Sequence, residues 1–246
     1  MRECLFCTNQ ADSREHLFPK WAIKDAKPKL PYRWAIGNRQ AISIANPNAT
    51  VKSVCEKCNH GWMSCLEDAS KKIIRPVSND VSIWLSDKDQ KLIARWAIKT
   101  AIVFESATDS ERKRCFPKPE REALRVDLDL PACTTVWIGR YNHLGLVALC
   151  DDFRANIKEV PHICNGCVVT FLLNHLVMQI IRFNIPSEYQ DRAFAINTEP
   201  GPWNKSLIQI WPTEGTRMWP PPLSFSAKGT LPISKLVGRL KAGTRL

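Results

Sequence analysis

The chain has 246 residues, and its content of 44% hydrophobic and 24% charged residues excludes a mainly disordered protein and indicates a folded, soluble one. Its longest apolar stretches are only strand-length and its N-terminus lacks the apolar region of a secretory signal, so we expect neither a membrane span nor export. The formal net charge is +11, with 13 basic against 7 acidic residues in residues 1–75, and this excess favours contact with polyanions.

The first third of the chain predicts short extended pieces followed by one helix. Residues 1–24 contain a cysteine pair and the dipeptide Glu15–His16, and residues 25–50, rich in Pro, Asn and Ala, are expected to form a long irregular connection. Thr50–Val54 alternates apolar and polar residues and leads into a turn and a helix with apolar residues at helical spacing. We expect the helix to end at Arg75–Pro76, because proline disfavours helical geometry in the residue before it.

The remainder predicts one long helix and several strands. Asp87–Ala107 has an apolar stripe broad enough to be buried, and a basic, proline-containing connection, Glu111–Arg125, follows it. Asn174–His175 is expected to form a hairpin turn, and Ile233–Lys241 a short basic helix. The strand-like runs are Thr134–Arg140, Leu144–Cys150, Cys167–Leu173, Val177–Phe183 and Ser206–Trp211.

These elements predict an α+β chain with two parts. Residues 1–80 would form a small unit, and residues 81–246 a larger mixed α+β domain with an antiparallel sheet. The sequence does not choose among specificity, dimerisation and regulation as the role of the larger part, and a homodimer stays an open alternative.

Two C-x-x-C motifs predict a metal site in the smaller part. Cys4 and Cys7 form the first, and Cys55 and Cys58 form the second. Each motif points two thiolates at one ion, and two motifs complete a tetrahedral zinc site that has no open position and is therefore structural. Buried free cysteines are the alternative. Because the ten cysteines occur without an export signal, we expect a reducing, cytoplasmic compartment in which the other cysteines stay reduced.

A second zinc site is a weaker hypothesis. Cys164 and Cys167 form a further C-x-x-C motif, with His162 two residues before it. No second knuckle accompanies this motif, so we do not favour a metal site there.

Taken together, the N-terminal motifs resemble a known enzyme family. The pattern C-x-x-C, E-H-x-x-P-x-W and C-x-x-C-N-x-G-W, over residues 4–62, looks like the zinc-knuckle branch of the HNH endonucleases. The resemblance implies a ββα-metal unit in which His16 is the general base that activates water, a task suited to its ordinary pKa of about 6.5. It also implies that Glu15 and Asn59 are oxygen ligands of one catalytic Mg²⁺ or Mn²⁺ ion. The implied activity is hydrolysis of DNA to 5′-phosphate and 3′-hydroxyl ends, with RNA not excluded.

The sequence departs from the family pattern at two points. The family usually has Asp before its base, and Glu15 is one methylene longer. The family's middle Asn, which orients the base, has three candidates here, and Asn48 is favoured over Asn46 and Asn38. These departures leave open a second hypothesis, in which the chain is a zinc-dependent nucleic-acid-binding protein on a catalytically idle scaffold.

Several residues near the motifs are candidate contacts to phosphate. These are Arg14, Lys20, Lys57 and His60. His60 has two further readings, as a metal ligand in place of Asn59 or as a helix cap. Asn59 itself is also placed to cap the helix that follows the second knuckle.

Overall fold

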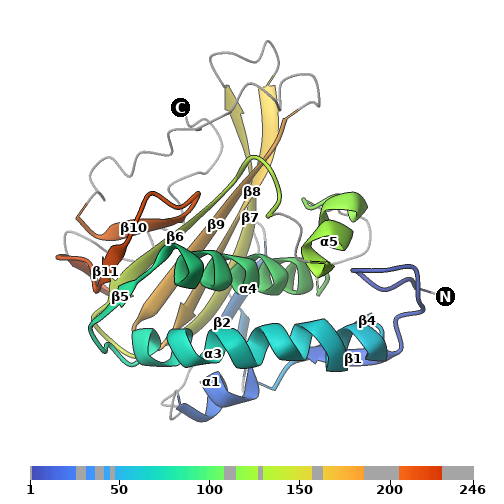
Figure 1. Cartoon of the computed structure of the whole chain (residues 1–246), viewed down its shortest axis with the longest axis horizontal. Helices are drawn as coiled ribbons and strands as arrows, with labels where there is room; N and C mark the ends of the chain where they lie inside the picture. The colour runs from blue at the N-terminus through green and yellow to red at the C-terminus, as the bar shows by residue number, and fades with distance from the viewer. Residues whose placement is uncertain are drawn as a thin grey trace.

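The computed structural model describes residues 2–25, 32–36, 42–44, 48–107, 115–126, 130–156, 163–185 and 205–228 (Figure 1). The N-terminal elements are β1 (Ser13–His16), α1 (Lys20–Asp25), β2 (Tyr32–Ile36), β3 (Ile42–Ile44), β4 (Thr50–Val54), α2 (Glu56–Cys58), the π-helical turn η1 (Asn59–Met63) and α3 (Ser64–Ser78). The elements that follow are β5 (Ile83–Leu85), α4 (Asp87–Glu105), α5 (Lys118–Arg125), β6 (Thr134–Tyr141), β7 (Leu146–Asn156), β8 (Ile163–Leu173), β9 (Leu176–Asn184), β10 (Leu207–Trp211), β11 (Arg217–Trp219) and β12 (Ser224–Phe225).

A large mixed sheet forms the centre of the described chain. Its strand order is β10-β6-β9-β8-β7-β2-β3, and β12 also pairs with β6. The strands from β10 to β7 are antiparallel to their neighbours, which confirms the predicted α+β class with an antiparallel sheet. In contrast, β2 joins β7 and β12 joins β6 in parallel. Two smaller sheets pair β1 with β4 and β5 with β11.

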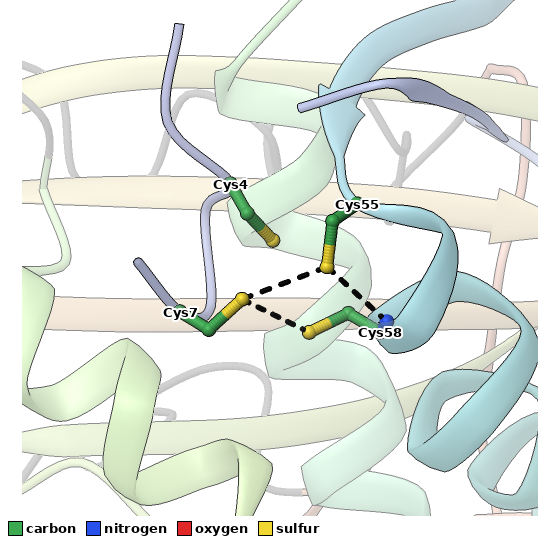
Figure 2. A group of neighbouring side chains, drawn as sticks. All are labelled: Cys4, Cys7, Cys55 and Cys58. Atoms are coloured by element: carbon green, nitrogen blue, oxygen red, sulfur yellow. Dashed lines mark hydrogen bonds between the residues drawn. The ribbon is translucent and has the colours of Figure 1, made fainter. Parts of the chain in front are cut away.

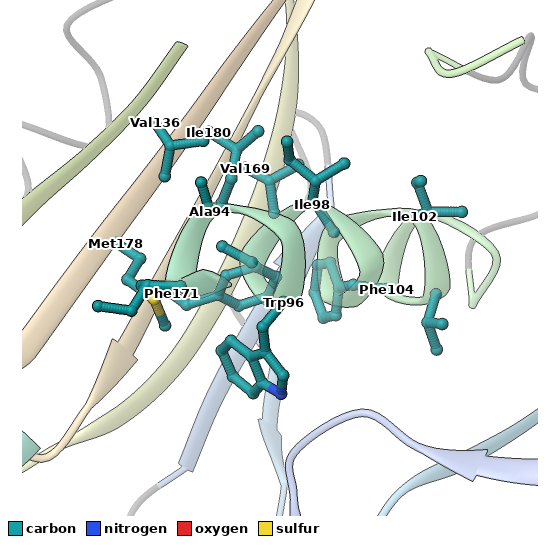
Figure 3. Close-up of a cluster of buried hydrophobic side chains, with 14 of the residues drawn as sticks. Ala94, Trp96, Ile98, Ile102, Phe104, Val136, Val169, Phe171, Met178 and Ile180 are labelled. Atoms are coloured by element: carbon teal, nitrogen blue, oxygen red, sulfur yellow. The ribbon is translucent and has the colours of Figure 1, made fainter. Parts of the chain in front are cut away.

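Helix α4 lies across one face of this sheet, between the sheet and α3 (Figure 1). A capping box fixes its start, because the Ser86 hydroxyl accepts a hydrogen bond from the Asp89 N–H and the Asp89 carboxylate accepts one from the Ser86 N–H. Ala94 and Ile98 of α4 lie against sheet residues such as Ile180, as Figure 3 shows. The helix therefore buries one face of the sheet, and its apolar stripe explains why it lies there.

The strands under α4 are buried on both faces. Along β9, Leu176, Met178 and Ile180 belong to the apolar cluster beneath α4, whereas Val177 and Ile181 belong to a second cluster on the opposite face. Successive side chains of a strand point to opposite faces, so this alternation follows directly from the extended backbone. A strand buried on both faces explains why the sequence shows a continuous apolar run there.

The apolar cluster beneath α4 extends into the N-terminal part of the chain. It includes Phe6 and Met63 from the N-terminal part, together with Trp96 and Ile180 from beyond residue 80. The division into domains at residue 80 stays a prediction, and the side chains on both sides of it pack into one core.

Most predicted elements agree with the structure. The predicted helix Asp87–Ala107 corresponds to α4, and the predicted strand-like runs correspond to β6, β7, β8, β9 and β10 with shifts of a few residues at their ends. The predicted turn at Asn174–His175 joins β8 to β9, and Asn174 has a φ of 53°, a left-handed conformation that Asn tolerates better than most residues.

Three local predictions were wrong. The irregular connection at residues 25–50 contains β2 and β3, because β2 pairs with β7, which lies far along the sequence, and β3 then pairs with β2. Helix α3 does not end at Arg75–Pro76 but continues to Ser78, with Pro76 in its last turn. The connection Glu111–Arg125 contains α5, with a proline in the first turn, where its missing N–H costs little. The predicted helix Ile233–Lys241 lies outside the described residues.

One pair of cysteines is oxidised. Cys115, in the segment before α5, forms a disulfide with Cys167 of β8, and their Cα atoms are 6.1 Å apart. The prediction that cysteines outside the knuckles stay reduced is therefore wrong for this pair, which packing of distant segments brings together. Cys167 is thereby excluded as a ligand of a second zinc site with Cys164 and His162, and His162 lies outside the described residues.

A core substitution tests the packing of α4 on the sheet. Phe171 of β8 is buried and packs edge-to-face against Phe104 of α4, with ring centroids 5.8 Å apart. We expect Phe171→Ala to lower the unfolding free energy by about 3–5 kcal/mol, because it removes a large buried ring and leaves a cavity. Chemical denaturation measures this change. Leu144→Ala, at a side chain that is 58% exposed, is the control and should shift it by less than about 0.5 kcal/mol. Equal effects of the two variants would contradict this packing.

Within the described ranges, no helix combines the length and the apolar content needed to cross a bilayer.

Candidate functional site

Two short strands and a helix bring the motif residues together. Strand β1 pairs antiparallel with β4, so that Glu15 lies opposite Val51 and His16 opposite Thr50. The chain then turns at Cys55 into α2, η1 and α3. Side chains alternate along β1, and Glu15 is buried whereas His16 is half-buried. The structure therefore has the predicted order of strand, strand and helix.

The four knuckle cysteines converge on one point (Figure 2). Their sulfur atoms all lie within 4.8 Å of one another, and Cys7 Sγ lies 3.5 Å from Cys55 Sγ and 3.6 Å from Cys58 Sγ. Zinc bound by four thiolates at about 2.3 Å places the sulfur atoms about 3.8 Å apart. The structure thus confirms that Cys4, Cys7, Cys55 and Cys58 form a group that could hold a metal such as zinc.

The thiols of this group differ in the direction in which their pKa is shifted. Burial of the Cys55 thiol opposes ionisation, but hydrogen bonds from the Cys58 backbone and from the side chains of Cys7, Cys58 and Asn9 lower its pKa to about 7. In contrast, burial raises the pKa of Cys4 and of Cys58. A divalent cation bound among the four sulfurs would favour the thiolate form of each, since a coordinating thiol is deprotonated.

Contacts outside the sulfur group hold the two knuckles against each other. The Asp12 carboxylate accepts a hydrogen bond of 2.8 Å from the Glu56 N–H at the start of α2. Phe6, within the first knuckle, packs edge-to-face against Trp62, with ring centroids 5.0 Å apart. These contacts join the loop of the first knuckle to the helix of the second, so the sulfur positions depend on both segments.

An open pocket with a volume of about 190 Å³ lies between β1 and the start of α1 on one side and η1 and the start of α3 on the other. It contains three of the four residues predicted to be catalytic, namely Glu15, His16 and Asn59. The structure therefore brings together residues that lie more than 40 positions apart in the sequence. The full lining is Glu15, His16, Pro19, Lys20, Asn59, His60, Met63, Ser64, Glu67 and Asp68.

The Glu15 carboxylate is held by a residue distant in the sequence. Lys99 Nζ, on α4, lies 3.1 Å from Glu15 Oε1, and Lys99 is only 2% exposed. Glu67 lies in the same electrostatic environment: burial raises its pKa, the Lys99 ammonium opposes that rise, and the Glu15 carboxylate adds to it. Two carboxyl groups of the pocket lining, those of Glu15 and Glu67, therefore interact with one buried ammonium, that of Lys99, which is not itself part of the lining.

The surroundings of His16 favour the neutral form of its imidazole ring. Partial burial lowers the pKa of His16 below its ordinary value, the Lys20 ammonium lowers it further, and the Glu15 carboxylate opposes both effects in part. A lowered pKa keeps the ring neutral at neutral pH, and the neutral ring is the form that accepts a proton.

The Asn59 side chain is hydrogen-bonded to β1 and does not cap the start of the helix. Its Nδ2 donates hydrogen bonds to Ser13 Oγ at 2.8 Å and to the Arg14 carbonyl at 3.1 Å. The N-cap of α2 is Cys55, whose sulfur accepts a hydrogen bond from the Cys58 N–H. The prediction that Asn59 caps the start of this helix was therefore wrong. Since both hydrogens of Nδ2 are used, Oδ1 is the amide atom left for a cation or a substrate.

The remaining predicted residues lie around this pocket. Arg14, Lys20, Lys57 and His60 are exposed, and of these Lys20 and His60 line the pocket. Asn48 is exposed just before β4 and is not part of the lining, while Asn38 and Asn46 lie outside the described residues. The identity of the residue that orients His16 therefore stays a prediction.

Sequence reasoning missed Glu67, Asp68 and Lys99. The first two lie on α3, beyond the π-helical turn η1 and the non-helical backbone of Gly61, so helical spacing counted from Asn59 or His60 does not place them. Lys99 gave no local signal either, because it lies 84 residues from Glu15 in the sequence.

Comparison of the chain with models of known protein families, with curated proteins and with solved structures finds no match.

Proposed function

We propose that the chain is a metal-dependent endonuclease of the HNH type that hydrolyses phosphodiester bonds in DNA, with a structural zinc ion in the four-cysteine group. The observation that carries the proposal is the pocket in which Glu15, His16 and Asn59 meet beside two converging knuckles. The net charge of +11 supports a polyanionic substrate.

His16 would act as the general base. Its neutral ring accepts a proton from water as the water oxygen attacks phosphorus, the bond from phosphorus to the 3′-oxygen breaks, and solvent protonates the departing oxygen. Lys20 and His60, exposed in the pocket lining, would contact the flanking phosphates and fix the register of the strand.

Glu15 and Asn59 would hold a catalytic Mg²⁺ or Mn²⁺ ion, since both offer the oxygen atoms that such hard cations prefer. The bound ion would act as a Lewis acid that stabilises negative charge on the phosphate and the departing oxygen. Among the described residues, the cysteine group is the one set of three or more Cys, His, Asp or Glu ligand atoms close enough to share an ion. Mg²⁺ suits a site with two protein ligands, because it keeps several waters and binds substrate phosphate.

The experiment that tests this function is plasmid cleavage by the purified full chain. Supercoiled DNA is incubated with Mg²⁺, Mn²⁺, Ni²⁺ or EDTA, and nicked and linear products are separated on a gel. We expect cutting that needs a divalent ion, stops with EDTA and leaves ligatable 5′-phosphate ends. A matched single-stranded RNA in the same assay decides between DNA and RNA. Absence of cutting of either nucleic acid under every metal condition would refute the proposed activity.

A second candidate function is supported by the Glu15–Lys99 contact. Because a buried ammonium already neutralises this carboxylate, the scaffold could bind nucleic acid without cutting it. A protein of this kind shifts labelled DNA in a native gel equally well with and without Mg²⁺, and the DNA remains intact.

A further inference from the structure

Lys99 occupies an unusual position for a lysine. It lies on α4 one turn after Trp96, with its ammonium 5.8 Å from the Trp96 ring centroid. Figure 3 shows Trp96 pointing away from the side chains of Val136, Val169 and Ile180. Residues three apart on a helix share a face, so Lys99 is presented on the side of α4 opposite the sheet. There it meets β1.

Structural stability alone is a poor explanation for this lysine. A buried charge is costly unless it is paired, and here Glu15 Oε1, at 3.1 Å, supplies the pair. Replacing a buried ion pair by apolar side chains is often neutral or stabilising, so a core position would ordinarily hold an apolar residue. The neighbours of Lys99 along α4, such as Ile98 and Ala101, are fully buried apolar residues. A buried lysine aimed at a pocket-lining carboxylate therefore points to a role in the pocket.

We infer that Lys99 is a positioning residue for Glu15. The ammonium holds Oε1, which leaves Oε2 as the carboxylate oxygen available to a divalent ion in the pocket. The inference rests on the proposed function, because it assigns Glu15 to a metal. The ion pair also offsets the flexibility of a glutamate at this position. A glutamate side chain has one more rotatable bond than an aspartate side chain, and the contact with Lys99 restricts rotation about it.

A consequence concerns the larger part of the chain. Lys99 belongs to α4, which is packed on the central sheet, so the geometry of the pocket depends on residues beyond 80. Residues 1–80 alone lack the group that orients Glu15. The larger part would therefore contribute to metal binding by holding Glu15, besides any role in specificity, dimerisation or regulation.

The test compares Lys99→Met with Lys99→Arg in the full, zinc-loaded chain. Affinity for Mn²⁺ is measured by electron paramagnetic resonance of the free ion, and plasmid cleavage is measured over a range of Mn²⁺ concentrations. Lys88→Met is the matched control, since Lys88 is exposed on the same helix. We expect Lys99→Met to weaken Mn²⁺ binding about 10- to 100-fold, the usual effect of losing a partner of a metal ligand. Lys99→Arg, which keeps the charge and the donors, should restore affinity toward the wild-type value.

A positioning role for Lys99 is distinguished from a merely structural role by which quantity changes in the variant, the affinity for Mn²⁺ or the affinity for DNA. We expect the Mn²⁺ concentration for half-maximal cleavage to rise with affinity for DNA unchanged, and Lys88→Met to behave as wild type. If Lys99→Met does not fold, Lys99→Leu, which also removes the donor to Glu15, replaces it, and the same loss of Mn²⁺ affinity is expected. Wild-type Mn²⁺ affinity in the Met variant overturns the inference, and tighter binding or faster cleavage overturns it in favour of a competing ammonium. If the wild type binds Mn²⁺ but cuts nothing, the proposed function fails while the affinity ratio still decides the role of Lys99. No Mn²⁺ binding by any form overturns both.

Discussion

Plasmid cleavage by His16→Ala should be about 10²- to 10⁴-fold slower than cleavage by the wild type, the range that a positioned general base contributes. Alanine cannot accept the proton of the attacking water, and the neighbouring Glu15 is engaged with Lys99. The measurement is the initial rate of nicking at saturating metal and DNA. His16 is only half-buried, so we expect the variant to keep its fold.

Three further readouts locate the defect in this variant. Zinc content, melting temperature and affinity for DNA should equal those of the wild type, because His16 is neither a knuckle ligand nor a core residue. His143→Ala is the matched control, since His143 is exposed between β6 and β7 and should leave the rate unchanged. Loss of folding in His16→Ala would instead make His16 a structural residue, and an undiminished rate would remove it from the mechanism.

The second large effect is expected from Cys55→Ser, which removes one sulfur from the four-cysteine group. Cys55 is 2% exposed and contacts Cys7 and Cys58, and a serine oxygen is a poor substitute for a thiolate toward zinc. Because metal binding and folding are coupled, we expect loss of bound zinc and a decrease of more than about 4 kcal/mol in unfolding free energy. For a chain of this size that is a fall of about 10 °C in melting temperature.

Zinc stoichiometry by mass spectrometry and a thermal melt measure these two changes. Cys65→Ser is the control: Cys65 is an exposed free cysteine on α3, ten residues further along, and its loss should change neither quantity. Full zinc occupancy in Cys55→Ser together with an unchanged melting temperature would show that the cysteines are an ordinary part of the core.

The residues of the candidate site differed in how visible they were in the sequence. The two C-x-x-C motifs were sufficient to predict one four-cysteine group, because each motif forces its own two sulfurs to one side of a tight turn. Glu15, His16 and Asn59 were found only through their position between and after these motifs, and the pocket confirms that they lie together without testing what they do.

Tertiary packing decided the rest. Lys99 reaches Glu15 only because α4 is packed between the sheet and the N-terminal segments, and Cys115 meets Cys167 only because the segment before α5 lies against β8. Strand β2 forms through pairing with β7, more than 100 residues away, and β3 in turn pairs with β2. Such contacts depend on the relative placement of whole elements. Helix α4, the main strands and the cysteine group could be predicted from the amino-acid sequence, because periodicity and ligand spacing act within a few residues, whereas long-range contacts leave no local pattern.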